Sequence, residues 1–325
     1  MTQPGVAGSS AAVVRRDRPT MYFIGVTTGQ SAIIGLFPIW AGILGIADAQ
    51  LVGVDAPLHA DPGTYRAAVR QIRDDPLSLG ALVTTHKVDL LAAADDLFDE
   101  LDPYARLCHE VSNIAKRDGR LIGLAKDPIT SGRSLNEMIE PGYWGRTGGH
   151  LLCLGAGGAT TALVAHLLGQ QETAERPARL IAVSRSRRGL DTLRGVVAEL
   201  RPDADVAYVL NEDPAANDRL LAGLPAGSMV VNATGMGKDR PGSPITDQGQ
   251  FPEQGVVWEL NYRGSLDFLH QARRQETDRE LAIHDGWRCF VHSWAEHIAE
   301  VFHLEIAPDT FDELAKAAET IRPPG

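Results

Sequence analysis

The sequence predicts an α/β protein of two domains, and three observations support this prediction. First, 325 residues exceed what a single hydrophobic core usually serves. Second, short apolar runs alternate regularly with helical patterns from residue 150 onward, as in a parallel sheet with crossover helices. Third, a glycine-rich turn follows one of these apolar runs directly, at residues 155–158. We therefore expect a smaller α/β unit followed by a doubly wound unit.

The first half of the chain shows strand and helix patterns in alternation. Its predicted strands are 21–26, 51–55, 79–84 and a hairpin over 111–125. Its predicted helices are 62–74, 88–100, 103–108 and 131–139. Ser31 precedes a further apolar helix and is placed to cap its N-terminus. A Gly-rich linker at 141–149 leads into the second half.

The second half is the regular part. Its predicted strands are 150–154, 179–184, 205–210, 228–232, 256–259 and 281–283, with helices between them. Two more helices, at 288–301 and 309–320, close the chain. We expect residues 1–20 to form a disordered tail, because they are Ala/Gly/Ser-rich and then basic, the wrong order for a secretory signal.

Composition excludes several classes of protein. A net charge of −11 argues against nucleic acid or an anionic membrane as a partner. No apolar run is long enough to span a bilayer. The three cysteines form no C-x-x-C, so we expect neither a metal site nor disulfides, and Cys153 is expected to be a core residue. These features favour the cytoplasm, and a homodimer is compatible with them.

The glycine-rich turn is the first candidate site. An apolar run ends at Leu154, Gly155, Ala156, Gly157, Gly158 and Ala159 follow, and a helical pattern then begins. Such a turn lets the backbone approach a pyrophosphate, and the helix N-terminus offers free N–H groups to it. Thr160 stands where the third glycine of G-x-G-x-x-G would be, and a plain strand–helix turn is the alternative.

The end of the next strand favours one cofactor over another. An NAD-binding fold usually has an Asp or Glu there, which accepts from the ribose 2′-OH. This chain has instead Ser184, Arg185, Ser186, Arg187 and Arg188, whose hydroxyl and guanidinium groups suit a 2′-phosphate. We therefore predict NADP as the cofactor, with a solvated basic loop as the alternative.

Three more places follow predicted strands, where the ligand crevice of a parallel sheet is expected, with an ordinary strand-end loop as the alternative. One is the turn with Asn232, Ala233, Thr234 and Met236. The second includes Lys87, and the third includes Asp127, which follows the hairpin. A lysine and a carboxylate can move a proton to or from a hydroxyl or ketone, which typically contributes about 10²–10⁴-fold to the rate. A lone Lys or Asp is more often a solvated surface residue.

Taken together, these landmarks resemble the shikimate dehydrogenase family over most of residues 21–303. Residues 25–31 resemble its Gly-x-x-x-x-His-Ser-x-Ser segment, and residues 83–87 its Asn-Val-Thr-x-Pro-Phe-Lys segment. Residues 111–114 are similar to Val-Asn-Thr-Leu and residues 123–127 to Gly-x-Asn-Thr-Asp. The nucleotide segments, at 155–159, 184–186 and 232–234, correspond as well.

The resemblance implies a fold and a set of roles. The implied fold is an N-terminal α/β substrate domain over 21–128, a Rossmann-type NADP domain over 129–287, and a C-terminal helical part, 288–325, that returns to the first domain. Lys87 and Asp127 would be the catalytic pair. The implied substrate-binding residues are Ser31, Thr84, Ser112, Asn113, Tyr262 and Ser293. The substrate would be a small cyclic hydroxylated molecule.

Departures from the family pattern affect the substrate side. Ile33 stands in place of the second serine that holds the substrate carboxylate, Ala125 in place of an asparagine, and Ser293 in place of a glutamine. A hydrogen bond to a charged group contributes roughly 1.5–3 kcal/mol. Losing two would weaken shikimate binding by roughly two orders of magnitude or more. We therefore expect retained alcohol–ketone chemistry on a changed substrate.

Two other hypotheses remain at this level. A non-catalytic nucleotide-binding or regulatory protein of the same fold would also tolerate an eroded substrate pocket. A folate-type dehydrogenase shares the two-domain layout and a lysine, but the spacing of Lys87 and Asp127 and the arginine-rich loop fit it less well. His86, where the family has an aromatic residue, is either a substrate contact or a satisfied polar residue.

Overall fold

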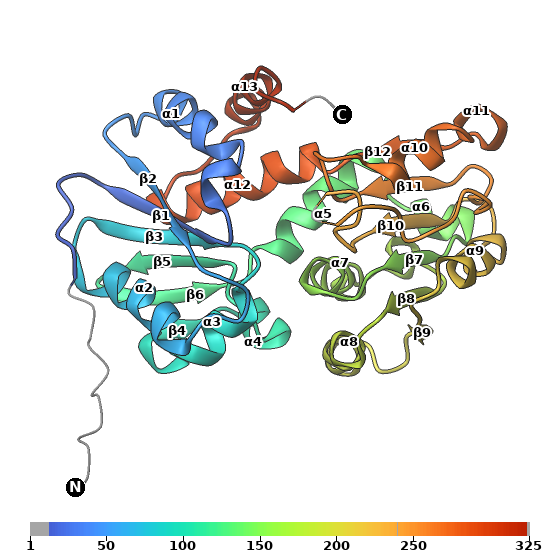
Figure 1. The fold of residues 1–325 in the computed structure, drawn as a ribbon, viewed down its shortest axis with the longest axis horizontal. Helices are drawn as coiled ribbons and strands as arrows, with labels where there is room; N and C mark the ends of the chain where they lie inside the picture. Colours follow the sequence, from blue (N-terminus) through green and yellow to red (C-terminus); the bar gives the residue numbers. More distant parts are fainter. Residues whose placement is uncertain (1–12, 239, 324–325) are drawn as a thin grey trace, which may run out of the picture. The chain divides into compact units, whose positions relative to one another are not determined.

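The computed structural model describes residues 13–238 and 240–323 (Figure 1). The chain divides into two compact units, Met1–Ala125 with His297–Ala317 (unit 1) and Lys126–Glu296 with Ala318–Gly325 (unit 2). The α/β fold class is confirmed, and residues 297–317 belong to unit 1, as expected for the returning C-terminal part. The divisions fall at 125/126, 296/297 and 317/318, whereas the sequence predicted 128/129 and 287/288 and gave all of 288–325 to the first domain.

Unit 1 is built on a mixed six-stranded sheet of order β2-β1-β3-β5-β6-β4. Strands β1, β2 and β3 are parallel, whereas β5 runs antiparallel to both β3 and β6. The strands are β1 (Thr20–Gly25), β2 (Gln50–Asp55), β3 (Ser78–Val83), β4 (Glu100–Leu101), β5 (Asn113–Arg117) and β6 (Arg120–Leu124). The helices of this unit are α1 (Ile33–Ile43), α2 (Pro62–Asp74), α3 (Lys87–Ala94), α4 (Pro103–Cys108), α13 (Pro308–Glu319) and the latter part of α12 (Trp287–Phe302).

Unit 2 is built on a fully parallel six-stranded sheet of order β12-β11-β10-β7-β8-β9. The strands are β7 (Leu151–Leu154), β8 (Leu180–Ser184), β9 (Val206–Leu210), β10 (Met229–Asn232), β11 (Val256–Glu259) and β12 (Ala282–His284). The helices are α5 (Asp127–Met138), α6 (Tyr143–Thr147), α7 (Gly158–Gly169), α8 (Arg187–Leu200), α9 (Pro214–Ala222), α10 (Asp267–Arg273) and α11 (Glu276–Arg279).

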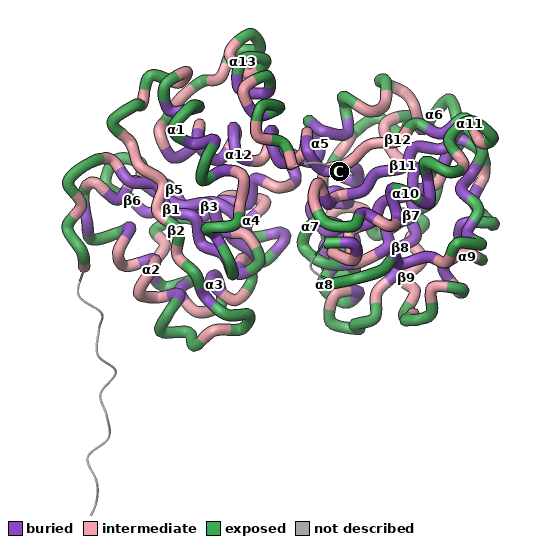
Figure 2. Tube along the Cα trace, turned by 45° about the horizontal axis from the view of Figure 1, so that its top comes forward, coloured by how far each residue is buried: buried purple, intermediate pink, exposed green. Residues whose placement is uncertain are grey.

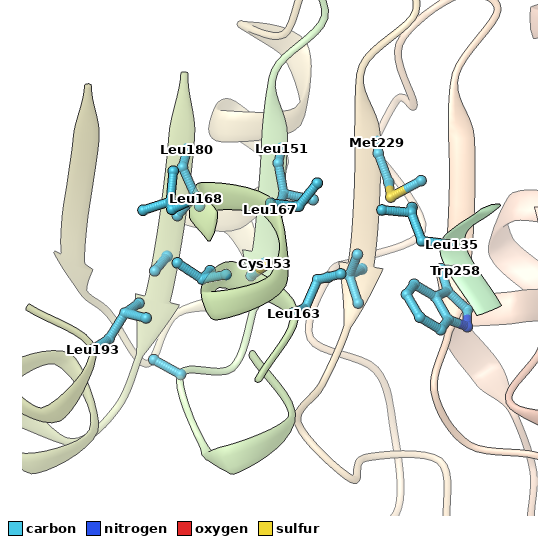
Figure 3. Packing of buried hydrophobic residues seen from close by; sticks show 14 of the residues in the cluster. Leu135, Leu151, Cys153, Leu163, Leu167, Leu168, Leu180, Leu193, Met229 and Trp258 are labelled. Carbon is cyan, nitrogen blue, oxygen red and sulfur yellow. The ribbon is translucent and has the colours of Figure 1, made fainter. Parts of the chain in front are cut away.

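The parallel sheet of unit 2 is buried on both faces. Leu151 and Cys153 of β7 pack with α7 in one cluster, which Figure 3 shows from close by, whereas Leu152 and Leu154 pack in a second cluster with α10. This alternation follows from the two-residue period of a strand. In Figure 2 the central strands of both units are drawn largely as buried. Because both faces of the sheet are covered, ligand-binding residues are expected at the carboxyl ends of the strands and in the loops that follow them.

Several predicted elements differ from the structure. Ser31 does not cap α1, because α1 begins at Ile33 and Ala32 stands at the N-cap position, where no side chain caps the helix. The N–H of Ser31 donates to the carbonyl of Thr28 and closes a short 3₁₀ turn. The helix predicted over 88–100 ends at Ala94, because residues 100–101 pair with β6 as strand β4. The linker contains α6, whose end is marked by Gly148 at a φ of 63°.

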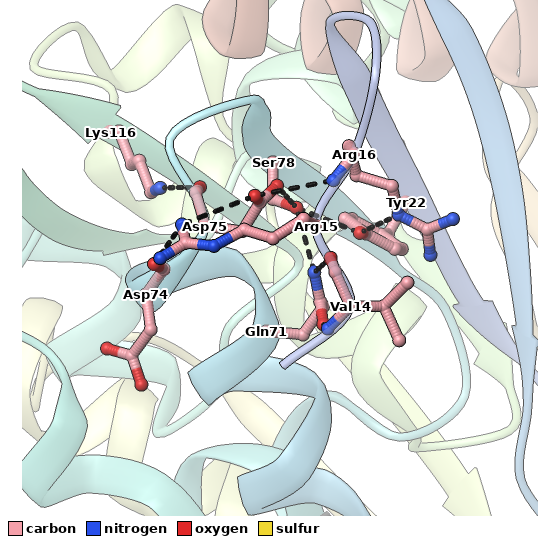
Figure 4. Close-up of polar contacts among 9 residues, drawn as sticks. All are labelled: Val14, Arg15, Arg16, Tyr22, Gln71, Asp74, Asp75, Ser78 and Lys116. Atoms are coloured by element: carbon pink, nitrogen blue, oxygen red, sulfur yellow. Dashed lines mark hydrogen bonds and ion pairs between the residues drawn. The ribbon is translucent and has the colours of Figure 1, made fainter. Parts of the chain in front are cut away.

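Part of the segment predicted as a disordered tail is ordered. Residues 1–12 lie outside the described residues, but Val14 exchanges two hydrogen bonds of 2.7 Å with the Gln71 side chain on α2 (Figure 4). Arg16 Nε donates to the Tyr22 hydroxyl at 2.8 Å, and its backbone N–H donates to Asp75. The segment from Val14 to Arg18, here called the N-terminal arm, is therefore fastened to unit 1.

Candidate active site

The glycine turn in unit 2 has the geometry of a phosphate site. Gly155, directly after β7, has a φ of 104°, and a Cβ there would lie 2.6 Å from the carbonyl oxygen of Ala233. Both facts require glycine at this position. Helix α7 starts at Gly158 with Gly157 as its N-cap, and no side chain caps it. The first N–H groups of α7 thus remain available to an anion.

Thr160 explains the departure from the full glycine motif. Its hydroxyl donates to the carbonyl of Gly155 at 2.6 Å, and the residue is buried. The threonine therefore ties the first turn of α7 to the glycine loop where a glycine would only permit close packing. Cys153 is buried beside it, as expected, and burial raises the pKa of its thiol to about 12, so this cysteine is no nucleophile.

The arginine-rich loop lies against the same turn. A Cβ on Gly189 would lie 2.4 Å from the carbonyl of Ala156, so the start of α8 touches the glycine loop. Within the described residues, no hydrogen bond or ion pair holds the guanidinium groups of Arg185, Arg187 and Arg188, and all three side chains are exposed. By contrast, Arg194 on the same helix pairs with Asp191. The Ser184 hydroxyl accepts from the N–H of Ser186 at 3.0 Å and shapes the loop.

The loop that follows β10 completes this part of the site. The carbonyl of Ala233 faces Gly155, so residues 155–159, 184–188 and 232–234 meet at the carboxyl edge of one sheet. Asn232 accepts from both the N–H and the hydroxyl of Thr234, and the Thr234 hydroxyl accepts from the N–H of Met236. The buried Glu259 holds Asn232 and was not identified from the sequence.

In unit 1, polar residues collect at the carboxyl edge of β1 and β3. Lys87 is the first residue of α3, and Thr84, directly after β3, donates from its hydroxyl to the carbonyl of Ile24 on β1 at 3.3 Å. The N–H of Val83 donates to the carbonyl of Ser112, which brings the 112–113 segment to the same edge. Thr84 and Lys87 are partly exposed, whereas Ser112 and Asn113 are buried.

The loop with Ser31 is held by a residue that was not identified from the sequence. Asp55, at the end of β2, accepts from the N–H of Thr28 at 2.8 Å and from its hydroxyl at 2.6 Å. These bonds, that to the hydroxyl first, lower the pKa of Asp55 below its ordinary value. Sequence spacing does not reveal this pair, because 27 residues separate its members and only the parallel pairing of β1 and β2 joins them.

Three residues of unit 1 that the sequence singled out are buried. The ring of His86 is buried and its Nδ1 pairs with the Tyr65 hydroxyl at 3.0 Å, so His86 is a core residue rather than an exposed contact. The side-chain amide of Asn113 donates to the carbonyl of His297 at 3.3 Å, while its Oδ1 has no partner within the described residues. Ile33 is fully buried, so the position of the second family serine has become part of the core.

The remaining predicted residues belong to unit 2. Asp127 begins α5, directly after Lys126, whose ammonium pairs with Glu296 at 3.3 Å. The ring of Tyr262 packs against Trp287 and Phe290 at centroid distances of 5.2 and 4.9 Å. Ser293 is partly exposed on α12.

The described residues carry no group of three or more His, Cys, Asp or Glu side chains placed to hold a metal ion. Nor does any helix among them combine the length and apolar character that crossing a membrane requires.

Known proteins resemble this chain over much of its length. No model of a known protein family matches it. It is 34% identical to the shikimate dehydrogenase (NADP(+)) of Symbiobacterium thermophilum over 239 residues, which are 72% of this chain and 74% of that protein. It is 30% identical to the enzyme of the same name from Lactococcus lactis subsp. cremoris, over 57% of this chain and 62% of that protein.

Solved structures show the same fold. A shikimate dehydrogenase in complex with NADP+ superposes with a TM-score of 0.71 at 18% identity, covering 97% of this chain and 99% of the other. A quinate dehydrogenase from Corynebacterium glutamicum in complex with NAD superposes with a TM-score of 0.70 at 18% identity, covering 94% and 100%. With a sequence relative above 30% identity matched over most of its length, and with this fold, the chain belongs to the shikimate dehydrogenase family.

Proposed function

We propose that this protein is an NADP-dependent oxidoreductase that interconverts a ring hydroxyl and a ketone on a shikimate-like cyclic, polyhydroxylated substrate. The observation that carries the proposal is the carboxyl edge of the sheet in unit 1. There the Ser31 loop, Thr84 and Lys87 come after the ends of β1 and β3, and Ser112 stands directly before the antiparallel strand β5. Hydroxyl groups and an ammonium are the donors that a polyhydroxylated, oxygen-rich ring requires.

The residues of unit 2 fit NADP rather than NAD. The uncapped start of α7 and the positive φ of Gly155 suit a pyrophosphate. Arg185 and Arg188 supply fork-shaped donors for a 2′-phosphate, and no carboxylate stands at the end of β8 to accept from a 2′-OH. When bound, the nicotinamide ring of NADP exchanges a hydride with the substrate carbon.

In the oxidation direction, Lys87 takes the proton of the reacting hydroxyl as the C–O bond becomes a carbonyl, and in reduction it returns that proton. Asp127 accepts a hydrogen bond from the same hydroxyl and orients it. Such acid–base help contributes about 10²–10⁴-fold. The assignment of both roles rests on the match of residues 83–87 and 123–127 to the family segments.

We do not expect shikimate itself to be the substrate. Ile33 and Ala125 are fully buried and apolar, so neither can donate to a substrate carboxylate. A related ring alcohol that carries no carboxylate, or whose carboxylate needs fewer hydrogen-bond donors, fits these residues better.

The test is reduction of NADP+ with shikimate, quinate and related cyclitols, followed by the absorbance of NADPH, with NAD+ in parallel. We expect turnover of at least one ring alcohol with NADP+ and little turnover of shikimate. Shikimate turnover at the rate of an ordinary metabolic enzyme would overturn the substrate argument. Binding of NADPH without turnover of any ring alcohol would favour the non-catalytic alternative.

The variant Lys87→Ala tests the assigned acid–base residue. We expect kcat to fall by about 10²-fold or more, because the proton then has no positioned acceptor, while the Kd of NADPH stays nearly unchanged. The control is Lys316→Ala, which removes an exposed lysine on α13. Unchanged turnover of Lys87→Ala would remove Lys87 from the mechanism.

A further inference from the structure

A buried carboxylate lies beneath the cofactor loop of unit 2. Glu259, the last residue of β11, is fully buried. Its Oε2 accepts from the side-chain amide of Asn232 at 2.6 Å. Its Oε1 accepts from the N–H and the side-chain amide of Asn261 at 2.8 and 2.7 Å. All the donors are neutral amides, so within the described residues no cation balances this carboxylate.

Burying a carboxylate without an opposite charge costs free energy. Burial, opposed by the three hydrogen bonds and assisted by nearby Asp285, raises the pKa of Glu259 from 4.5 to about 7. A glutamine would avoid the cost of a buried charge, but it would also present an NH₂ group to one of the two asparagine amides. A full carboxylate is the side chain that accepts from every one of these donors.

The two asparagines connect Glu259 to the loop 232–237 by hydrogen bonds. Asn232 accepts from the N–H and hydroxyl of Thr234 at 3.1 and 2.7 Å. Asn261 uses the same amide nitrogen to donate to the carbonyl of Met236 at 3.0 Å. By accepting from both amides, Glu259 fixes which end of each asparagine faces the loop.

The loop in turn forms one wall of the glycine turn. Ala233, between Asn232 and Thr234, places its carbonyl oxygen 2.6 Å from where a Cβ of Gly155 would be. A shift of this loop by a few tenths of an ångström would therefore change the space at the glycine turn. Two hydrogen-bonded steps connect Glu259 to that space.

We propose that Glu259 is a positioning residue of the cofactor site, which holds the loop 232–237 in its NADP-binding conformation through Asn232 and Asn261. This inference rests on the proposed function, since it takes NADP as the ligand of unit 2. Glu259 itself contacts no cofactor atom in this scheme.

The main test compares the Kd of NADPH for the full-length protein and for Glu259→Gln at pH 8. We expect an approximately tenfold rise in Kd, because the variant leaves one amide without an acceptor and releases its asparagine. Glu253→Gln makes the same chemical change at an exposed site of the same unit and should leave the Kd unchanged. Thermal unfolding confirms that each variant is folded.

The pH profile separates positioning from a merely structural role. The pKa of Glu259 near 7 means that the carboxylate protonates as the pH falls through 7, and the protonated acid resembles glutamine. The Kd values of the wild type and Glu259→Gln should therefore differ above pH 7 and converge near pH 6. Ionisation of the 2′-phosphate affects both proteins alike. Two other charged groups lie around this network, Asp285 after β12 and Arg240 beside Thr234. Both are present in the wild type and in the variant, so their titration affects the two Kd values alike.

Asn261→Ala is the second variant. It leaves Glu259 in place but removes the bond to Met236, and it should raise the Kd of NADPH in the same direction; it decides the question if Glu259→Gln does not fold. Wild-type binding of NADPH with equal Kd values for a folded Glu259→Gln would overturn the positioning role and leave the proposed function intact. No binding of NADPH by the wild type would overturn both.

Discussion

At the scale of single residues, an arginine whose guanidinium has no protein partner is a candidate ligand contact, whereas a paired arginine serves the fold. Arg194 on α8 pairs with Asp191 and lies over the ring of Tyr208 at 4.5 Å, so its charge is used within the fold. Arg185 lies on the loop before α8, and Arg188 lies in the first turn of α8. Neither guanidinium has such a partner within the described residues. An unpaired guanidinium beside the glycine turn is suited to bind a phosphate group, such as the 2′-phosphate of NADP.

The double variant Arg185→Ala/Arg188→Ala tests this assignment. We expect the Kd of NADPH to rise by about 10- to 100-fold, because charge-assisted hydrogen bonds to the 2′-phosphate are lost, while the Kd of NADH changes little. Fluorescence titration of both cofactors measures the ratio. Arg194→Ala is the matched control on the same helix. Equal losses for NADPH and NADH would show that the loop does not distinguish the 2′ position.

At the scale of elements, loops gain their order from groups distant in sequence. The Ser31 loop is held by Asp55 of β2, and the N-terminal arm is held by Gln71 and Asp75 at the end of α2. Burial, the largest influence, raises the pKa of Asp75, but hydrogen bonds from Ser78 and Arg16 together with the Arg15 charge bring it below its ordinary value. Lys116 of β5 adds a 2.7 Å hydrogen bond to the Asp75 carbonyl.

Gln71→Ala tests whether the N-terminal arm is fastened in solution. The change removes both hydrogen bonds to Val14, and we expect faster tryptic cleavage after Arg15 and Arg16 with little loss of global stability, about 1 kcal/mol or less. Thr64→Ala, an exposed change on the same helix, is the control. Cleavage at the wild-type rate would mean that the arm is already released in solution.

At the scale of the whole molecule, each unit has a hydrophobic core of its own. The cluster around Tyr22, Val69 and Leu90 serves unit 1, whereas two clusters on either face of the second sheet serve unit 2. Each core is thus large enough to order its own strand ends. The candidate cofactor residues all lie in unit 2.

Hydrogen exchange with and without NADPH tests this division. A ligand at 100 times its Kd stabilises the folded state that binds it by about 2.7 kcal/mol. We expect added protection to concentrate in residues 155–160, 184–189 and 232–237, with NADH at the same concentration giving less. Protection confined to unit 1 would contradict the assignment of the cofactor site.

Much of this could be predicted from the sequence because the signals are local. The strand at 256–259 and the helices at 62–74 and 103–108 agree with the structure to the residue, since apolar period, Pro at the first turn and Asp caps all lie within a few positions. The glycine turn and the arginine-rich loop were found for the same reason. Their assigned ligand roles stay predictions.

Errors arose where contacts formed in the folded chain prevailed over residue type and sequence pattern. Ser31 has the residue type of a cap, but its N–H closes a turn with Thr28. Residues 100–101 continue a helical pattern, yet they pair with β6. Residues 14–18 have the composition of a tail, yet α2 offers them partners.

The sequence by itself thus determined the fold class, the order of most elements and the family resemblance, and it supplied the candidate site residues whose roles stay predictions. Tertiary structure alone decided that Glu259, Asn232 and Asn261 form one network, that Asp55 holds the Ser31 loop, and that His86 is a core residue. The physical reason is that propensities and motifs act over a few residues. The burial of a carboxylate, by contrast, and the partners it obtains there depend on which strands become neighbours.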